Sequence, residues 1–188
     1  MVDDLCKKIL ILVMNKLNAQ QLRKSNPTDK ELKKIKRNPI YLILDRIIDT
    51  YNIGSLFRLA DAIAAQKVYL CGDMEYPPSS RIHKAAVGTE QWTPWEKKDS
   101  TLKTIKELKK KGIQIIAVEQ DSRSISYKEF KPNFPCAIVV GNETGGMEQK
   151  VLNKVDIIVE LPMYGINKSF NVWGSGAIVA YKAIEELL

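Results

Sequence analysis

Two unbroken apolar runs in the second half of the chain constrain its fold more than any other feature. The sequence reads FPCAIVVG over residues 134–141 and VDIIVELP over residues 155–162. Short runs of this kind, without alternating polar positions, are typical of strands that are buried on both faces of a parallel sheet. The two runs therefore predict the interior of a sheet that helices cover on both sides.

Helical and strand patterns alternate along the rest of the chain. The length of 188 residues suits one domain, and the alternation predicts a doubly wound α/β domain from about residue 39 to residue 188. Further strands are expected at residues 39–45, 67–72 and 112–119. Helices are expected at residues 51–64, 80–86, 101–112 and 175–188, and a loop at residues 88–97.

Residues 1–38 are expected to form a short, basic, helical N-terminal extension. Residues 4–24 have a helical pattern, and Thr28 begins a second short helix in which Glu31 completes a capping box. The net charge of the chain is +7, and residues 1–46 contribute +6 of it, from 11 Lys and Arg against 5 Asp and Glu. Such a segment either keeps the protein in solution or contacts the phosphates of a nucleic acid. The residues expected to make these contacts are Lys33, Lys34, Lys36 and Arg37.

The cysteines and the single histidine argue against several kinds of site. Cys6, Cys71 and Cys136 lie far apart and form no CxxC pair, so we expect reduced thiols. With His83 as the only histidine, neither a zinc cluster nor a Ser-His-Asp triad has the residues it needs, and no metal is expected. The longest apolar run near the start, residues 9–14, is far shorter than the roughly 20 residues of a membrane span. A cytoplasmic protein is expected.

Ligands of open α/β sheets bind at the carboxyl ends of the strands. One loop in that position leads into a helix whose apolar residues recur at helical spacing from Ile53 to Ala60, so that Arg58 points away from the core. Asn52 stands where an N-cap is expected. From this pattern alone, Arg58 is either a solvated side chain or one that the helix presents to a ligand. The loops selected by the strand-end rule are residues 45–52, 141–147 and 161–171.

The other two loops are rich in glycine. The second, GNETGGM, matches neither the dinucleotide fingerprint nor the P-loop, and Glu143 could simply favour the start of the next helix. The third, LPMYGINKSFNVWGSGA, offers Ser169 or Asn171 as the N-cap of the final helix. Gly174 and Gly176 each cost that helix about 1 kcal/mol relative to alanine. They indicate either a weak helix start or the close approach of another backbone or a ligand.

Together, the three loops resemble the three motifs of the SpoU/TrmH-type RNA 2′-O-ribose methyltransferases of the SPOUT superfamily. The first motif appears as NIGSLFRLADA, with the Asn-x-Gly-x-x-x-Arg pattern of Asn52 and Arg58. The second appears as VVGNETGGM and the third as LPMYGINKSFNVWGSGA, in the family's order and spacing. The resemblance runs from about residue 38 to the end of the chain. Phe170 and Trp173 stand where the third motif usually has Leu and Ser.

The resemblance implies a particular fold and site. The parallel sheet, flanked by helices, would carry a deep C-terminal trefoil knot that binds S-adenosylmethionine, in a homodimer with the active site at the subunit interface. The substrate would be a tRNA or an rRNA. The cofactor-binding residues that it implies are Val140, Gly141, Asn142, Leu161, Met163 and Phe170. The catalytic residues that it implies are Arg58, which would act on the ribose 2′-hydroxyl and contact the RNA, and Asn52, Glu143, Ser169 and Asn171, which would position the reactants.

Physical chemistry narrows the expected role of Arg58. A guanidinium group stays protonated at ordinary pH, so it is a poor general base. We expect it to stabilise the developing 2′-oxyanion and an adjacent phosphate, while a phosphate or water accepts the proton. We expect Glu143 to hold Arg58 or Asn52 in place.

Three other functions stay open. They are methylation of a base atom on the same fold, RNA binding without catalysis by a knotted scaffold, and cofactor binding by an α/β domain that does not act on RNA. Asn52 and Arg58 favour a ribose methyltransferase over the first, because the resemblance associates them with that branch. The basic extension would have no purpose in the last.

Overall fold

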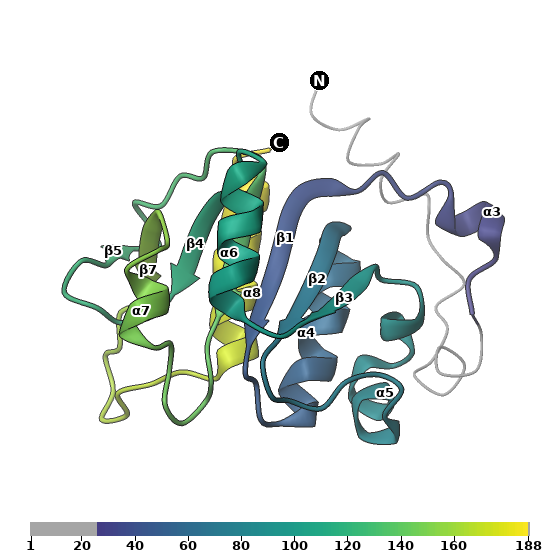
Figure 1. Cartoon of the computed structure of the whole chain (residues 1–188), viewed down its shortest axis with the longest axis horizontal. Coiled ribbons are helices and arrows are strands. Elements are labelled where there is room, and N and C mark those ends of the chain that lie inside the picture. Colours follow the sequence, from purple (N-terminus) through teal and green to yellow (C-terminus); the bar gives the residue numbers. More distant parts are fainter. Residues whose placement is uncertain (1–25, 188) are drawn as a thin grey trace.

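The chain folds around one seven-stranded parallel sheet (Figure 1). The structure, a computed structural model, describes residues 26–187. The strands lie in the order β3-β2-β1-β6-β4-β7-β5, and all neighbouring strands are parallel. In chain order they are β1 (Asn38–Asp45), β2 (Ala65–Cys71), β3 (Trp95–Lys98), β4 (Gln114–Val118), β5 (Ile125–Ser126), β6 (Cys136–Val140) and β7 (Ile157–Glu160).

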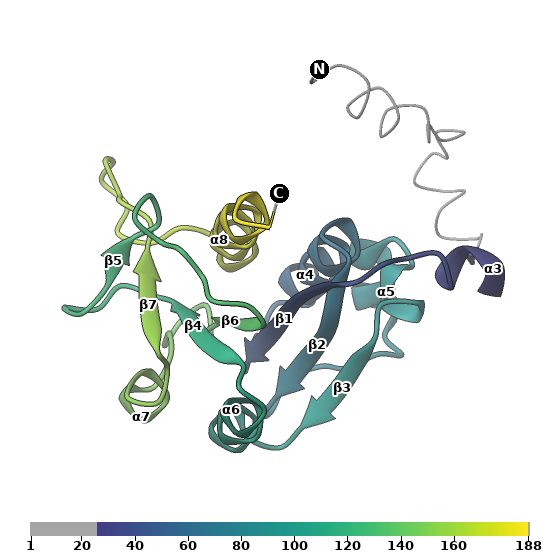
Figure 2. The ribbon, with the colours of Figure 1, turned by 90° about the horizontal axis from the view of Figure 1, so that it is seen from above.

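Helices cover both faces of the sheet (Figure 2). On one face, the core joins the sheet to α4 (Thr50–Ala62), α5 (Ser80–Ala86) and α8 (Val172–Glu185). On the other face, a second core cluster joins it to α6 (Thr101–Lys110) and α7 (Gln149–Leu152). The central strand β6 is buried along its whole length, which confirms the prediction from the unbroken apolar run. In the part of the chain that the structure describes, no helix is long and apolar enough to cross a membrane.

The longer predicted strands and helices are confirmed, and several of the shortest elements were not expected. Residues 88–97 are not a loop, because they contain the 3₁₀ helix η1 (Thr89–Gln91) and the edge strand β3. Strand β3 has four residues and none of them is fully buried, so it produces no apolar run. Strand β5 and helix α7 are also too short for a periodic pattern. The helix predicted at residues 4–24 lies outside the described residues, and the trefoil knot stays a prediction.

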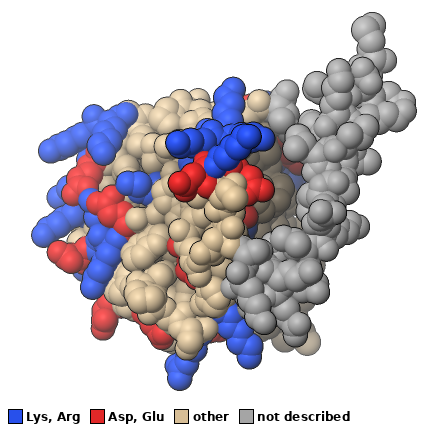
Figure 3. Space-filling view, turned by 90° about the vertical axis from the view of Figure 1, so that its right-hand side faces the viewer, with Lys and Arg blue, Asp and Glu red and all other residues tan. Residues whose placement is uncertain are grey.

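The described part of the basic segment, residues 26–37, lies at the other end of the sheet from the three loops. It begins with α3 (Asp29–Leu32), which lies at the upper right of Figure 1, whereas the carboxyl ends of the strands point downward. Thr28 and Glu31 form the predicted capping box. On the face that carries α3, basic side chains lie along the rim, with acidic side chains beside several of them (Figure 3).

Two of the three cysteines are thiols inside the sheet, as predicted. Cys71 and Cys136 are fully buried and form no disulfide. Burial raises the pKa of Cys71 to about 11 and that of Cys136 to about 12. Both groups are therefore protonated and unreactive at neutral pH. Cys6 lies outside the described residues.

Candidate active site

Three side chains from distant parts of the chain form one hydrogen-bonded row. Asn52, in the first turn of α4, donates to Glu143 Oε1 (2.8 Å) and accepts from Nδ2 of Asn171 (3.2 Å). Glu143 follows β6, and Asn171 precedes α8. Asn52 is only 3% exposed, and both polar atoms of its amide have partners, as a buried amide requires. The row thus joins one residue from each of the three predicted motifs.

The two ends of the row also fix the starts of two helices. Glu143 accepts hydrogen bonds from the backbone N–H groups of Ile48 (2.8 Å) and Asp49 (3.0 Å), just before α4. Asn171 is the N-cap of α8, as predicted, and accepts from two N–H groups of its first turn at 3.0 and 3.4 Å. The N-cap of α4 is Asp49, not Asn52 as predicted, because the helix begins at Thr50.

The carboxylate of Glu143 accepts three hydrogen bonds. Burial opposes its ionisation, but the hydrogen bonds from Asn52, Ile48 and Asp49 together outweigh burial, and the pKa of Glu143 lies below its ordinary value. Both oxygens of the ionised group accept hydrogen bonds. Of the two partners predicted for Glu143, Asn52 is confirmed and Arg58 is not.

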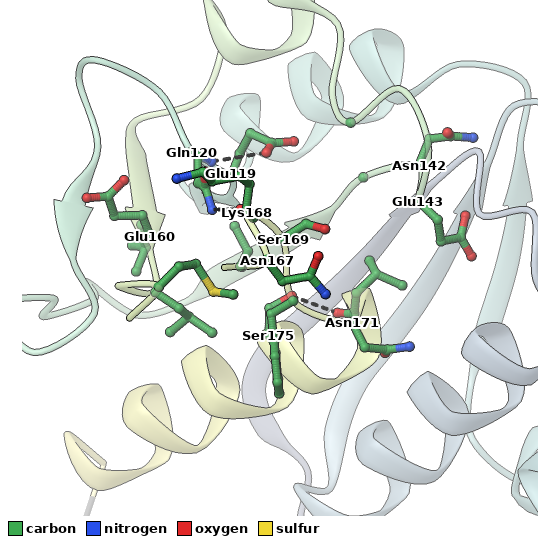
Figure 4. Close-up of a pocket in the computed structure, with 18 of the residues that line it drawn as sticks. Glu119, Gln120, Asn142, Glu143, Glu160, Asn167, Lys168, Ser169, Asn171 and Ser175 are labelled. Carbon is green, nitrogen blue, oxygen red and sulfur yellow. Dashed lines mark hydrogen bonds between the residues drawn. The ribbon is translucent and has the colours of Figure 1, made fainter. Parts of the chain in front are cut away.

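A cavity of about 560 Å³ opens beside the row, at the carboxyl ends of β4, β6 and β7 (Figure 4). Its volume is in the range typical of sites for small molecules and cofactors. Its position, at the carboxyl ends of neighbouring parallel strands, is the usual ligand position in open α/β folds. The residues that line it come from the segments 118–120, 141–146, 159–163 and 167–175.

A sequence model of the SpoU rRNA Methylase family matches residues 39–181. The chain belongs to this family. Its relatives include the 23S rRNA (guanosine-2′-O-)-methyltransferase RlmB of Neisseria meningitidis serogroup B, which is 32% identical over 148 residues. That match covers 79% of this chain and 59% of the relative, so the chain spans less than two thirds of the relative's length.

Solved structures of SpoU enzymes share the fold. The AdoMet-bound rRNA methyltransferase from Sinorhizobium meliloti has a TM-score of 0.75 and 25% identity, over 89% of this chain and 60% of that one. A TrmH/SpoU tRNA modifying enzyme from A. aeolicus has a TM-score of 0.74 and 24% identity, over 89% of this chain and 81% of that one. The predicted family and the helix-flanked parallel sheet are therefore confirmed.

The cavity of this SpoU chain contains most of the residues that the motifs predicted. Three of them do not line it: Asn52, Arg58 and Val140, whose side chain is buried beside Gly176 of α8. The predicted cofactor-binding residues that line the cavity are Gly141, Asn142, Leu161, Met163 and Phe170. The predicted catalytic residues that line it are Glu143, Ser169 and Asn171.

The glycines at the start of α8 make room for side chains. A Cβ atom on Gly174 would lie 2.6 Å from Cε1 of Phe170, and one on Gly176 would lie 3.0 Å from Cγ1 of Val140. Within the described chain, side chains approach both glycines, and the approach of another backbone or a ligand stays a prediction. The first of these contacts places the ring of Phe170 at the cavity, where the family usually has Leu.

Arg58 lies outside the cavity. It is exposed on α4, and no hydrogen bond or ion pair connects it to the rest of the described chain. Its exposure confirms that the helix directs it away from the core. The guanidinium of Arg58 therefore does not face the cavity of its own chain.

The basic residues before β1 divide into two kinds. Arg37 donates to the carbonyl oxygens of Ala65 (3.0 Å) and Trp92 (3.2 Å), so it connects β1 to β2 and to the segment after η1. Charge density in the sequence does not reveal this role in the fold. The basic residues of this stretch that are exposed are Lys30, Lys33, Lys34 and Lys36.

Sequence reasoning missed several residues that line the cavity. Glu119 and Gln120 directly follow β4, and Glu160 ends β7, so the strand-end rule could have identified all three. Others lie within the third motif but were not singled out as site residues. They include Asn167, Lys168 and Ser175. None of the described residues forms a group of His, Cys, Asp and Glu side chains suited to a metal ion.

Proposed function

We propose that this SpoU protein is an S-adenosylmethionine-dependent methyltransferase that acts on a ribose 2′-hydroxyl of tRNA or rRNA. The observation that carries the proposal is the Glu143–Asn52–Asn171 row beside a cavity of cofactor size. The names of the relatives support it, since one is a guanosine-2′-O-methyltransferase and one solved structure holds AdoMet.

The residues of the cavity suit S-adenosylmethionine. Leu161 and Met163 offer apolar surface for the adenine ring, while Asn142 and Ser169 offer hydrogen-bonding groups. When bound, S-adenosylmethionine supplies the methyl group, whose bond to sulfur breaks as its bond to the ribose 2′-oxygen forms. Gly141, at the end of β6, lets the chain turn tightly at the wall of this cavity, where a Cβ atom would lie 2.8 Å from Cγ of Met147.

The chain's own residues position the reactants and stabilise the charge that develops on the 2′-oxygen. The guanidinium of Arg58 donates to the 2′-oxygen as negative charge develops and to a neighbouring phosphate, while the 2′-proton leaves to a phosphate or water. Glu143 does not take this proton, because its pKa is lowered and its oxygens already accept hydrogen bonds. It holds Asn52, which in turn holds Asn171 and the start of α8.

The proposal includes a homodimer, because Arg58 needs a cavity other than that of its own chain. Exposed apolar side chains at the start of α4 and along α8 would be covered by a second copy. They are Ile48, Tyr51, Ile178 and Tyr181, which are 63%, 58%, 39% and 51% exposed. If each site combines two chains, mixing an inactive Arg58→Ala chain with an inactive Asn171→Ala chain should restore part of the activity. A protein that is monomeric by light scattering at micromolar concentration, or a mixture that stays inactive, would reject the dimer.

The lysines before β1 would contact RNA phosphates. Each such contact that is lost should reduce the slope of log K against log salt concentration by about 0.7 to 0.9. The triple variant Lys33→Ala, Lys34→Ala and Lys36→Ala should therefore bind RNA with a flatter salt dependence. It keeps Arg37 and its contacts within the fold, unlike a deletion of residues 1–37. An unchanged slope would show that these lysines do not contact RNA phosphates and would favour the alternative that they keep the protein in solution.

Two measurements test the function as a whole. Calorimetry with S-adenosylmethionine separates a cofactor-binding protein from a scaffold that only binds RNA. Transfer of a labelled methyl group to bulk tRNA and rRNA, followed by digestion to nucleosides, should then yield 2′-O-methylnucleosides. Label in a base would favour the alternative of a base methyltransferase. The proposal includes a cytoplasmic location, where these RNA substrates are found.

A further inference from the structure

Two residues outside the three motifs connect the loops of the second and third motifs. Glu119 and Gln120 directly follow β4. Glu119 Oε2 accepts the backbone N–H of Met147 (3.0 Å), in the second loop. Gln120 Nε2 donates to the backbone carbonyl of Lys168 (2.7 Å), in the third loop. Glu119, Gln120 and Lys168 lie together on one side of the cavity (Figure 4).

The contact of Glu119 explains a glycine of the second motif. Gly146 has a φ of +61°, which L side chains rarely adopt, and a Cβ atom there would lie 2.7 Å from Oε2 of Glu119. Only glycine lets the carboxylate reach the N–H of Met147. The other oxygen, Oε1, accepts the N–H of Gln120 (3.0 Å), so Glu119 also fixes the backbone from which the Gln120 side chain extends.

The third loop has little else to hold it. Tyr164 is 89% exposed and Ile166 is 99% exposed. Within the described chain, the bond from Gln120 to Lys168 is the one hydrogen bond that connects residues 162–170 to another segment. Yet the same loop contributes Met163 and residues 167–170 to the wall of the cavity. The position of that wall therefore depends on a single exposed amide.

We propose that Gln120 is a positioning residue that holds the third loop against the bound cofactor, and that Glu119 orients it. The inference rests on the proposed function, since it takes S-adenosylmethionine to be the ligand. The amide acts through the carbonyl of Lys168 and not on the reacting atoms. Without this bond the loop departs from the cavity more often, and the cofactor dissociates faster.

Gln120→Ala and Gln120→Glu test this role, because neither can donate the hydrogen bond and the exposed position tolerates both. Gln149→Ala is the control, since Gln149 is an exposed glutamine that donates to Asn153 (3.1 Å), and it lies outside the residues that line the cavity. The first measurement is trypsin cleavage after Lys168 in the protein without cofactor, and the second is the calorimetric Kd for S-adenosylmethionine. Both Gln120 variants should be cleaved about 5-fold faster and bind about 5-fold more weakly, the effect of one ordinary hydrogen bond, while the control matches wild type.

The outcomes distinguish this inference from the proposed function. Wild-type protein that does not bind S-adenosylmethionine would overturn the proposed function, although the cleavage measurement would still report on the loop. Wild-type binding with unchanged cleavage and affinity in both Gln120 variants would overturn the inference alone. Weaker binding with unchanged cleavage would also overturn it, because Gln120 would then act by contacting the ligand directly. Faster cleavage with unchanged affinity would overturn it as well, because the loop would then not hold the cofactor.

Discussion

Replacing Asn52 by aspartate should make folding stability strongly dependent on pH. The substitution keeps the shape of the side chain but turns the donor that faces Glu143 Oε1 at 2.8 Å into a second carboxylate oxygen. The position is 3% exposed whereas Glu143 is exposed, so solvent screens the two charges only in part. A lost hydrogen bond to a charged group costs about 1.5 to 3 kcal/mol, and the repulsion adds to that cost.

The variant can escape the repulsion by binding a proton. The introduced carboxyl group, once protonated, would donate to Glu143 as the amide does, so its pKa should rise above the unfolded-state value of about 3.9. The folded state then binds more protons than the unfolded state, and stability falls as pH rises, by about 1.4 kcal/mol per pH unit between the two pKa values. We expect Asn52→Asp to lose about 1 kcal/mol relative to wild type at about pH 5 and about 3 kcal/mol or more at about pH 8.

Urea unfolding of wild type, Asn52→Asp and Asn52→Ala at the two pH values measures these differences. The alanine variant leaves Glu143 its two backbone donors and introduces no charge, so it should lose a similar free energy, about 1.5 to 3 kcal/mol, at both pH values. Comparison with wild type at the same pH removes the titration of all other groups. If the loss in Asn52→Asp were the same at both pH values, the Asn52–Glu143 contact would not have the strength inferred here.

Three further predictions concern single residues. Arg58→Lys should lower the rate of methyl transfer by about 100-fold or more without changing the Kd for cofactor. Activity close to that of wild type would show that the reaction does not need the planar guanidinium, which donates to the 2′-oxygen and to a phosphate at once. Gly54→Ala should lower the free energy of unfolding by about 1 to 3 kcal/mol, with Ser55→Ala as control, because the new Cβ would lie 2.5 Å from that of Ala85. Glu143→Gln should be less stable than wild type at neutral pH. Because the pKa of Glu143 is lowered on folding, this difference in unfolding free energy should shrink as pH falls below the unfolded-state value of about 4.3.

The sequence predicts the sheet and the site through different signals. Buried strands such as β6 are visible because both faces are apolar. The row of Asn52, Glu143 and Asn171 has no such signal, since Glu143 and Asn171 lie 91 and 119 positions from Asn52, and only the resemblance of the three loops links them. Strand β3 was not predicted, because an edge strand need not be apolar on both faces.

Residues that act through hydrogen bonds to the backbone are the hardest to predict. Arg37 and Gln120 bind carbonyl oxygens, and every residue offers a carbonyl, so no partner of a particular type marks the contact in the sequence. Arg37 was assigned to RNA by charge density, whereas its guanidinium holds two segments of the fold together. The strand-end rule could have placed Gln120 near the ligand, but its bond to the third loop is visible only in the structure.

The exposed lysines lie far from the cavity, so an assay with a small substrate does not measure their contribution to RNA binding. β1 has eight residues, so at about 3.3 Å per residue its two ends are about 26 Å apart. Lys36 precedes one end, and the segment that Glu143 holds follows the other. Within one chain, a mononucleotide can fill a site at the cavity without reaching the lysines, whereas a folded RNA can touch both. Turnover of a minimal oligonucleotide should therefore depend little on salt even where binding of the whole RNA depends on it steeply.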